Sequence, residues 1–62
     1  MNELHDYRIL YRCFKGPGYW GHFKDTKAFN LEHAQKKVER IRAAYQAVHG
    51  VTGEFKAVPR GV

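Results

Sequence analysis

Cysteine, proline and long apolar runs are all scarce in this chain of 62 residues. Cys13 is its one cysteine, so no intramolecular disulfide can form and no thiol-rich metal site is available. No segment approaches the roughly 20 apolar residues of a membrane-spanning helix, and residues 1–6 lack the basic and apolar stretches of a secretory signal. These absences predict a cytoplasmic protein that is neither exported nor embedded in a membrane.

Groupings of residues that support catalysis are missing as well. The four histidines are His5, His22, His33 and His49. No two of them have the i,i+4 or zinc-finger spacing that would bring them to one metal ion. The run Gly16-Pro17-Gly18 lacks the spacing and the Lys-Ser/Thr pair of a phosphate-binding loop, and no general base is identifiable beside Cys13. We therefore predict a protein that is not an enzyme and that has no catalytic residue, cofactor or metal.

Apolar residues, in contrast, are numerous enough for a packed interior. Hydrophobic residues make up 44% of the chain and aromatic residues 15%, which indicates a folded protein rather than a disordered one. A chain of this length has room for one core, so residues 1–62 are expected to form a single small domain. Such a domain buries roughly 60% of the surface that its unfolded chain exposes.

The charge is clearly basic, with 11 Lys and Arg residues against 6 Asp and Glu residues and a formal net charge of +5. This balance favours polyanions or acidic protein surfaces as partners. It also falls within the range of roughly 2 to 8 that keeps an ordinary small domain soluble. Charge by itself therefore does not choose a partner.

Three segments have the alternating pattern of β-strands. Residues 7–14 alternate with period two and are rich in side chains that favour strands. Residues 19–24 have the same character. Residues 54–58 alternate again and end at Pro59, because proline cannot donate a hydrogen bond to a sheet. These segments predict three strands.

The connections between these strands also have characteristic sequences. Residues 15–18, Lys-Gly-Pro-Gly, predict a type II turn, and the polar residues 25–27 predict a loop after the second strand. Within that second strand, Gly21 is a candidate for a bulge. Trp20 and His22 share one face of the strand, opposite Tyr19 and Phe23, but the pattern does not show which face of the sheet Trp20 and His22 occupy.

Residues 31–49 are predicted to form the one helix. The apolar residues on its stripe are Leu31, Ala34, Val38, Ile41, Tyr45 and Val48. Their spacings of three and four place them on a single side. Asn30 is suited to cap the first turn, Glu32 complements the positive end of the helix dipole, and Gly50 can take the left-handed conformation that ends a helix.

The order of these elements predicts an α+β fold with β-β-α-β connectivity. A right-handed crossover through the helix places the third strand parallel to the second. If the third strand docks beside the first, the sheet has the order 2-1-3 and all neighbouring strands are antiparallel. The helix then covers the face that carries Tyr7, Ile9, Tyr11, Cys13, Phe55 and Ala57.

One helix covers only one face of a sheet, so the other face is expected to lie in solvent. That face would carry Leu10 and Val58 beside charged residues, a composition enriched at binding interfaces. The predicted partner-binding residues are Arg8, Arg12, Phe14, Trp20 and Lys56 on the sheet and Lys36, Lys37 and Arg40 on the helix.

Three kinds of partner are compatible with this surface. An acidic protein surface would use the aromatic residues and arginines as anchors, whereas a nucleic acid would stack bases on the aromatic rings and place phosphates on the cations. A second copy of the chain could also pair through this face or through the free strand edges, giving a homodimer or a larger structural oligomer. On the helix, the spacings Glu32–Lys36 and Glu39–Arg42 instead favour a solvated, salt-bridged surface.

The chain also resembles small accessory proteins of phages and prophages with the same layout. The resemblance extends from Tyr7 to Val58 and includes the hairpin, the helix entry Phe29-Asn30-Leu31-Glu32 and the closing strand Glu54-Phe55-Lys56-Ala57-Val58. It implies a host-directed role in the host cytoplasm, such as inhibition or modulation of a host nucleic-acid enzyme or defence complex. It transfers no functional residue.

Overall fold

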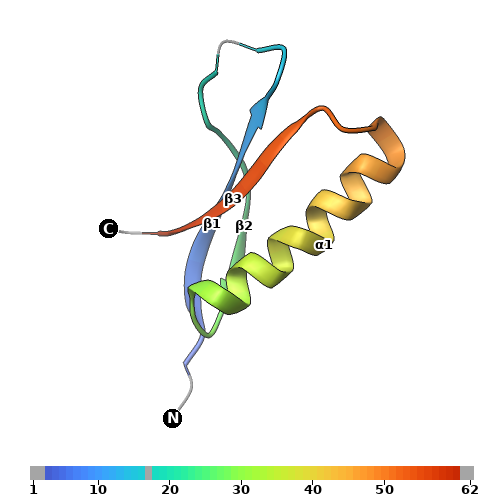
Figure 1. The fold of residues 1–62 in the computed structure, drawn as a ribbon. Coiled ribbons are helices and arrows are strands. Elements are labelled where there is room, and N and C mark those ends of the chain that lie inside the picture. The colour runs from blue at the N-terminus through green and yellow to red at the C-terminus, as the bar shows by residue number, and fades with distance from the viewer. Residues whose placement is uncertain (1–2, 17, 61–62) are drawn as a thin grey trace.

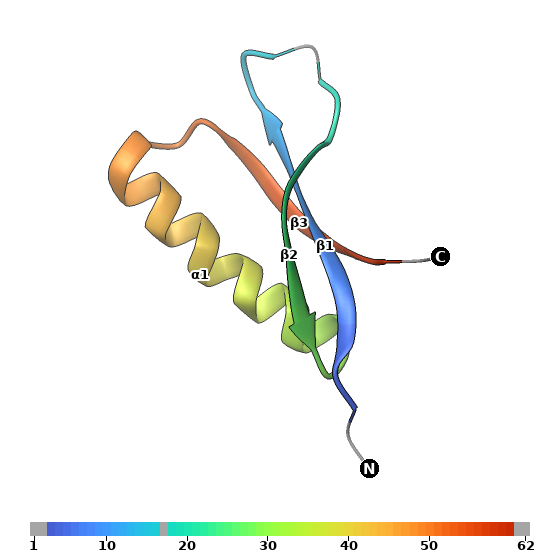
Figure 2. The same cartoon turned by 180° about the vertical axis from the view of Figure 1, so that it is seen from behind.

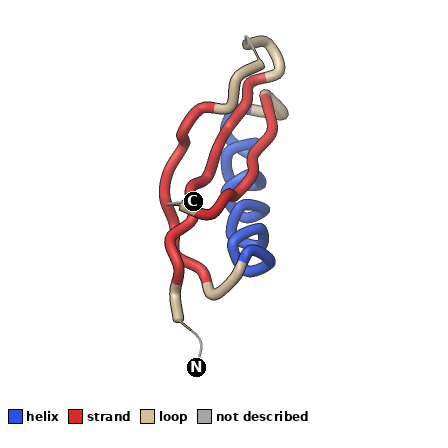
Figure 3. Tube along the Cα trace, turned by 90° about the vertical axis from the view of Figure 1, so that its left-hand side faces the viewer, coloured by secondary structure: helices blue, strands red, loops and turns tan. Residues whose placement is uncertain are grey.

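The structure is a computed structural model that describes residues 3–16 and 18–60. Its elements follow the order β1 (His5–Cys13), β2 (Gly21–Ala28), α1 (Leu31–His49) and β3 (Gly53–Pro59). The sheet has the order β2-β1-β3, and both neighbouring pairs are antiparallel. Figures 1 and 2 show α1 running diagonally along one side of the twisted sheet, and Figure 3 shows the two layers. The predicted α+β fold and strand order are confirmed.

The second strand differs most from its prediction. Residues 25–27 were expected to form a loop, and this expectation is wrong, because β2 continues through them to Ala28. They pair in order with Arg8, Tyr7 and Asp6 of β1. Ladder hydrogen bonds to a central strand stabilise the extended backbone whatever the polarity of the side chains, so one exposed edge strand can be almost wholly polar.

The bulge lies at Phe23 rather than at Gly21. Ile9 pairs with Lys24 and Leu10 with His22, so Phe23 is the extra residue in β2. An extra residue disrupts the alternation and re-aims the neighbouring side chains. The Phe23 ring accordingly packs among aromatic rings on the helix side of the sheet, with centroids 5.1 Å from Phe55 and 6.1 Å from Tyr45.

The hairpin between β1 and β2 begins with a tight turn. The N–H of Gly16 donates to the carbonyl of Cys13 at 3.2 Å. Gly18 has a φ of 88°, a conformation that glycine adopts without steric cost and that the predicted type II turn requires. Pro17, the remaining residue of that prediction, lies outside the described residues.

Both predicted helix caps are present. The Asn30 side chain accepts a hydrogen bond from the N–H of His33 at 2.8 Å, and His33 Nδ1 accepts one from the N–H of Phe29 at 3.1 Å. At the other end, Gly50 has a φ of 79° and its N–H donates to the carbonyl of Gln46 at 2.8 Å. The helix bounds Leu31–His49 therefore equal those read from the sequence.

Replacing Asn30 with Ala is expected to lower the free energy of unfolding by about 1 kcal/mol, because the first turn loses a side-chain acceptor for its free N–H groups. Urea denaturation followed by circular dichroism measures this. Asn30→Asp keeps the acceptor and should change the unfolding midpoint little. An unchanged midpoint for Asn30→Ala would show that the cap contributes nothing to stability.

The buried core lies between the middle of the helix and the helix-facing side of the sheet. Its residues are Tyr7, Ile9, Ala28, Ala34, Val38 and Ala57, with Ile41 and Phe55 packed against it. The two ends of the predicted apolar stripe stay outside it, since Leu31 is 46% exposed and Val48 is 75% exposed. Three small alanines bring helix and sheet close together in the middle.

An aromatic cluster extends this core toward the C-terminal end of α1. It consists of Tyr11, Phe23, Tyr45 and Phe55, and its closest pair is Tyr11 with Phe55 at 4.8 Å between centroids. The Tyr11 hydroxyl is hydrogen-bonded to Thr52 Oγ1 at 2.9 Å, which satisfies the polar end of a ring that is otherwise packed. The cluster ties all four elements together where the helix and the sheet diverge.

Candidate binding surface on the open sheet face

The face of the sheet that α1 leaves uncovered is defined by the strand register. Arg8, Leu10 and Arg12 alternate along β1 with the residues that face the helix, and directly opposed residues on neighbouring strands project to the same side. Their direct partners are Asp25, His22, Val58, Lys56 and Glu54. We call these residues, with Trp20 and the charged residues in contact with them, the open face.

Trp20 lies on the open face, held beside two cations. The guanidinium carbon of Arg12 is 4.8 Å from the centroid of its ring, and Nζ of Lys56 is 4.2 Å from it. Each cation–π contact at an exposed site contributes about 0.5–1 kcal/mol. His22 is opposite Leu10, so Trp20 and His22 share the open face, a point that the sequence left undecided.

The acidic side chains of the open face are engaged in ion pairs. Glu54 accepts from Arg12 at 2.5 Å, and Asp25 lies 2.8 Å from His22 and 3.4 Å from Arg60. The hydrogen bond from His22 is the largest cause that lowers the pKa of Asp25, and the positive charge of Arg60 lowers it further. Exposed pairs of this kind are screened by solvent and contribute little stability, so they orient side chains more than they stabilise the fold.

Basic residues on this side outnumber acidic ones. The basic residues are Arg8, Arg12, Lys27, Lys56 and Arg60, and the acidic residues are Asp6, Asp25 and Glu54. Within the described part of the chain, neither Arg8 nor Lys56 lies within ion-pair distance of a carboxylate. The surface therefore offers Lys56 beside Trp20 and the half-buried Leu10, and Arg8 opposite Asp25 without a direct ion pair between them.

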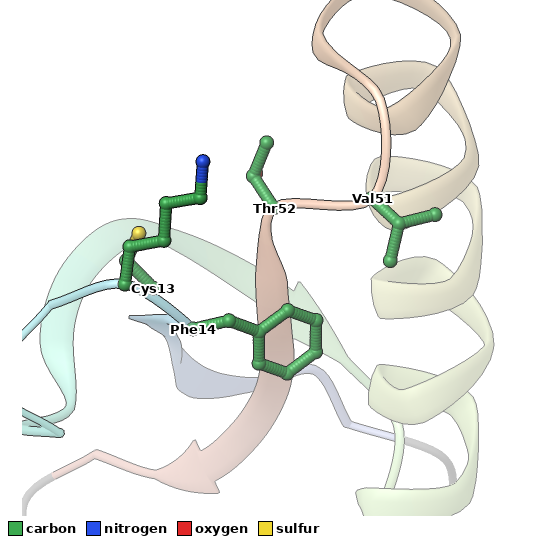
Figure 4. Close-up of a pocket in the computed structure, with 5 residues that line it drawn as sticks. Cys13, Phe14, Val51 and Thr52 are labelled. Atoms are coloured by element: carbon green, nitrogen blue, oxygen red, sulfur yellow. The ribbon is translucent and has the colours of Figure 1, made fainter.

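Phe14 lies apart from this group. It follows the last residue of β1, and its N–H donates to the carbonyl of Thr52 at 2.9 Å. The ring is 57% exposed and lines a shallow pocket of about 300 Å³ with Cys13, Lys15, Val51 and Thr52. Figure 4 shows these residues gathered where the end of β1 meets the link into β3.

The Cys13 thiol at this pocket is half-buried rather than enclosed in the core. The N–H of Lys15 is the largest cause that lowers the pKa of Cys13, while partial burial opposes it. Among the described residues, no group of three or more His, Cys, Asp or Glu side chains could hold a metal ion.

The basic residues of the helix do not extend the open face. Lys36 and Arg40 are exposed on α1, which packs on the opposite side of the sheet from Arg8. Lys37 is partly buried instead, and its Nζ donates to the backbone carbonyl of Lys27 at 2.5 Å. The structure thus separates the predicted site into the open face, an outer helix surface and a contact at the edge of β2.

Two residues of the open face were missed in the sequence. Asp25 and Arg60 form an ion pair beside Arg8, but Asp25 was expected in a loop and Arg60 lies beyond the end of the predicted third strand. In the structure, His5 pairs with Ala28 and Asp6 pairs with Lys27, which shows that residues 25–27 belong to β2. No local signal in residues 25–27 shows this pairing.

In comparisons with known proteins, no family model matches the chain, and no curated protein or solved structure matches it significantly. Within the described residues, no helix is both long and apolar enough to cross a membrane.

Proposed function

We propose that this chain is a small non-enzymatic binding protein that docks an acidic surface of another protein on its open face. The observation that carries the proposal is the group formed by Trp20, Arg12 and Lys56, on the same face as Arg8, which has no direct ion pair within the described residues. Tryptophan and arginine are enriched among the residues that dominate binding energy at protein interfaces. A partner that presents carboxylates would neutralise Arg8 and Lys56 while covering Trp20 and Leu10.

Two features favour a protein over a nucleic acid as the ligand. Carboxylates interrupt the positive charge of the open face, because Glu54 forms an ion pair with Arg12 and Asp25 forms one with Arg60. Binding of a phosphate backbone is favoured instead by an uninterrupted row of cations. The Trp20 ring is also already in contact with two cations, which compete with a base for the ring. A surface with charges of both signs around an aromatic residue is suited to a protein surface that carries the opposite pattern of charges.

The proposed role is that of an inhibitor or modulator of its partner. It follows from the resemblance to phage and prophage accessory proteins, whose site of action would be the host cytoplasm. The small size, and the placement of Arg8, Arg12 and Lys56 on strands with Trp20 held against two of them, agree with a rigid module that blocks a surface by covering it.

Reversal of charge on the open face is expected to abolish capture of the partner. Arg8→Glu removes a cation that, in the described part of the chain, has no direct ion pair, and it adds a repulsive charge, so binding to an acidic surface should weaken at least about tenfold. The measurement is crosslinking and affinity capture from host lysate, with and without nuclease. Arg40→Glu is the matched control, because it makes the same charge change on the outer surface of α1.

The outcomes separate the candidate partners. The proposal predicts that nuclease has no effect and that Arg40→Glu captures the same protein as the unmodified chain. Loss of capture on nuclease treatment would instead identify a nucleic acid as the ligand. Equal loss for Arg8→Glu and Arg40→Glu would mean that net charge, and not the open face, determines binding.

A further inference from the structure

The two edges of the sheet differ in how they are protected. An edge strand presents unpaired N–H and C=O groups that can pair with another chain unless bulges, lysines or other side chains prevent it. β2 and β3 are the two edge strands. β2 has such protection: it carries the bulge at Phe23 and the exposed Lys24 and Lys27.

The contact of Lys37 adds to the protection of β2. In an antiparallel ladder, the N–H and C=O of one residue point toward the same neighbouring strand. The carbonyl of Asp6 accepts from the N–H of Arg60, so Asp6 bonds toward β3, and its opposite residue Lys27 points its backbone groups outward. Nζ of Lys37 donates to that outward carbonyl of Lys27. A lysine from the helix therefore occupies the edge of β2.

The edge of β3 carries Lys56 and ends at Pro59, but within the described part of the chain no helix side chain bonds to its outward backbone groups as Lys37 does on β2. The carbonyl of Asp6 accepts from Arg60, and the N–H of Phe14 donates to Thr52. Both bonds show that alternate residues of β1, from Asp6 to Phe14, bond toward β3. The residues of β3 opposite them form hydrogen bonds to β1. The residues of β3 between these positions point their N–H and C=O groups away from β1, toward the open edge. These outward residues are Gly53, Phe55, Ala57 and Pro59, and Pro59 has only its carbonyl to offer.

We propose that the edge of β3 pairs antiparallel with β3 of a second copy of this chain, centred on Phe55. In this register, Phe55 exchanges both backbone hydrogen bonds with the partner's Phe55, and Gly53 does so with the partner's Ala57. On the open face, Glu54 stands opposite the partner's Lys56, and the two-fold axis repeats this pair. The segment Glu54-Phe55-Lys56 is thus complementary to itself in charge when it runs antiparallel.

The charges of Glu54 and Lys56 favour this register over the other antiparallel registers of two β3 strands. Centring on Lys56 would place two lysines directly opposite each other, and centring on Glu54 would do the same with two glutamates. Like charges at opposed positions are destabilising. Centring on Ala57 would place Phe55 opposite Pro59, which has no N–H to donate. Only the register centred on Phe55 has opposite charges and complete backbone pairing.

The resulting dimer is closed and has a simple architecture. The two-fold axis is perpendicular to the sheet, so the strand order becomes 2-1-3-3-1-2 and both helices lie on one side. The two open faces lie on the other side as one continuous surface. Arg12 holds Oε2 of Glu54, and the second carboxylate oxygen is directed to the partner's Lys56. This dimerisation does not rest on the function proposed above, but it pairs Lys56 with a carboxylate of the second copy, so in the dimer Arg8 is the cation left for the acidic surface of another protein.

Sedimentation velocity over a range of protein concentrations tests the proposal with two charge variants. Wild type is expected to show a reversible monomer–dimer equilibrium. In Glu54→Lys, two lysines stand opposite each other at positions 54 and 56 of the two copies, and in Lys56→Glu two glutamates do. Each variant alone should therefore self-associate at least about tenfold more weakly than wild type. An equimolar mixture of the two variants restores opposite charges across the axis and should form a heterodimer.

Controls keep the test independent of folding and net charge. The doubly exchanged variant, Glu54→Lys with Lys56→Glu, should dimerise like wild type, and circular dichroism establishes that every variant is folded. Lys36→Glu alters the charge on the outer surface of α1 and should leave dimerisation unchanged. A wild type that is monomeric at every concentration overturns the proposal. So does a mixture of the single variants that shows no more dimer than each alone.

Discussion

Ile9→Ala is expected to remove a large part of the stability of this domain and to leave a substantial unfolded population under mild conditions. Ile9 is completely buried, with 0% exposure, at the centre of the central strand. Truncation of a buried isoleucine to alanine costs about 2–5 kcal/mol, because transfer energy is lost and a cavity remains. At roughly 0.05–0.15 kcal/mol per residue, a domain of this length has only about 3–9 kcal/mol in total.

Urea denaturation at 25 °C, followed by far-ultraviolet circular dichroism, measures the loss. Ile9→Val removes one methylene and is expected to cost only about 0.5–1.5 kcal/mol. Leu10→Ala is the matched control on the neighbouring residue, since Leu10 projects to the open face and is only partly buried. If Leu10→Ala destabilised the protein as much as Ile9→Ala, the helix side of the sheet would not be the main core.

The helix was fully predictable because independent local signals coincide in it. The apolar spacing of three and four, the Asn30 cap and the Gly50 stop all indicate the same bounds, and the structure has helix from Leu31 to His49. Each of these signals depends only on residues within a few positions of each other. The strand order could also be derived, because the crossover rule leaves few ways to connect two strands, a helix and a third strand.

The extent of the second strand could not be predicted from local sequence patterns. Residues 25–27 are polar and are typical of a loop, yet they pair with β1 along their whole length. Their conformation is determined by the neighbouring strand, which is distant in sequence. The bulge at Phe23 likewise depends on the aromatic ring reaching Tyr45 and Phe55, and single-sequence patterns contain no information on that contact.

The composition of the open face was predictable from the sequence only in part. Alternation correctly indicated which β1 residues lie away from the helix, and β1–β3 pairing places Lys56 and Glu54 beside them. Lys37 was predicted to bind a partner, but its ammonium instead bonds a carbonyl at the edge of β2. A lysine on a helix has the same sequence signature in both roles, and only the packing of α1 against the sheet distinguishes them.

Gly53→Ala is the second substitution with a large expected effect, although it adds only one methyl group. An added Cβ would lie 2.3 Å from the carbonyl oxygen of Arg12 and 2.7 Å from the nearest atom of the Tyr11 ring. Neither neighbour can move freely. The Arg12 carbonyl belongs to the central strand, and the Tyr11 ring is held by the Thr52 hydrogen bond and by Phe55. Overpacking of this kind costs about 1–3 kcal/mol.

Gly21→Ala provides a control on the other side of the same tyrosine. Gly21 pairs with Tyr11 across the β1–β2 ladder, and a Cβ there would meet nothing closer than the Tyr11 carbonyl at 3.9 Å. Because 3.9 Å is ordinary van der Waals contact, Gly21→Ala should leave the urea midpoint nearly unchanged, while Gly53→Ala lowers it and changes the near-ultraviolet signal of the aromatic cluster. Equal midpoints for the two variants would show that neither the Arg12 carbonyl nor the Tyr11 ring is fixed against Gly53, because both must shift to leave room for the methyl group.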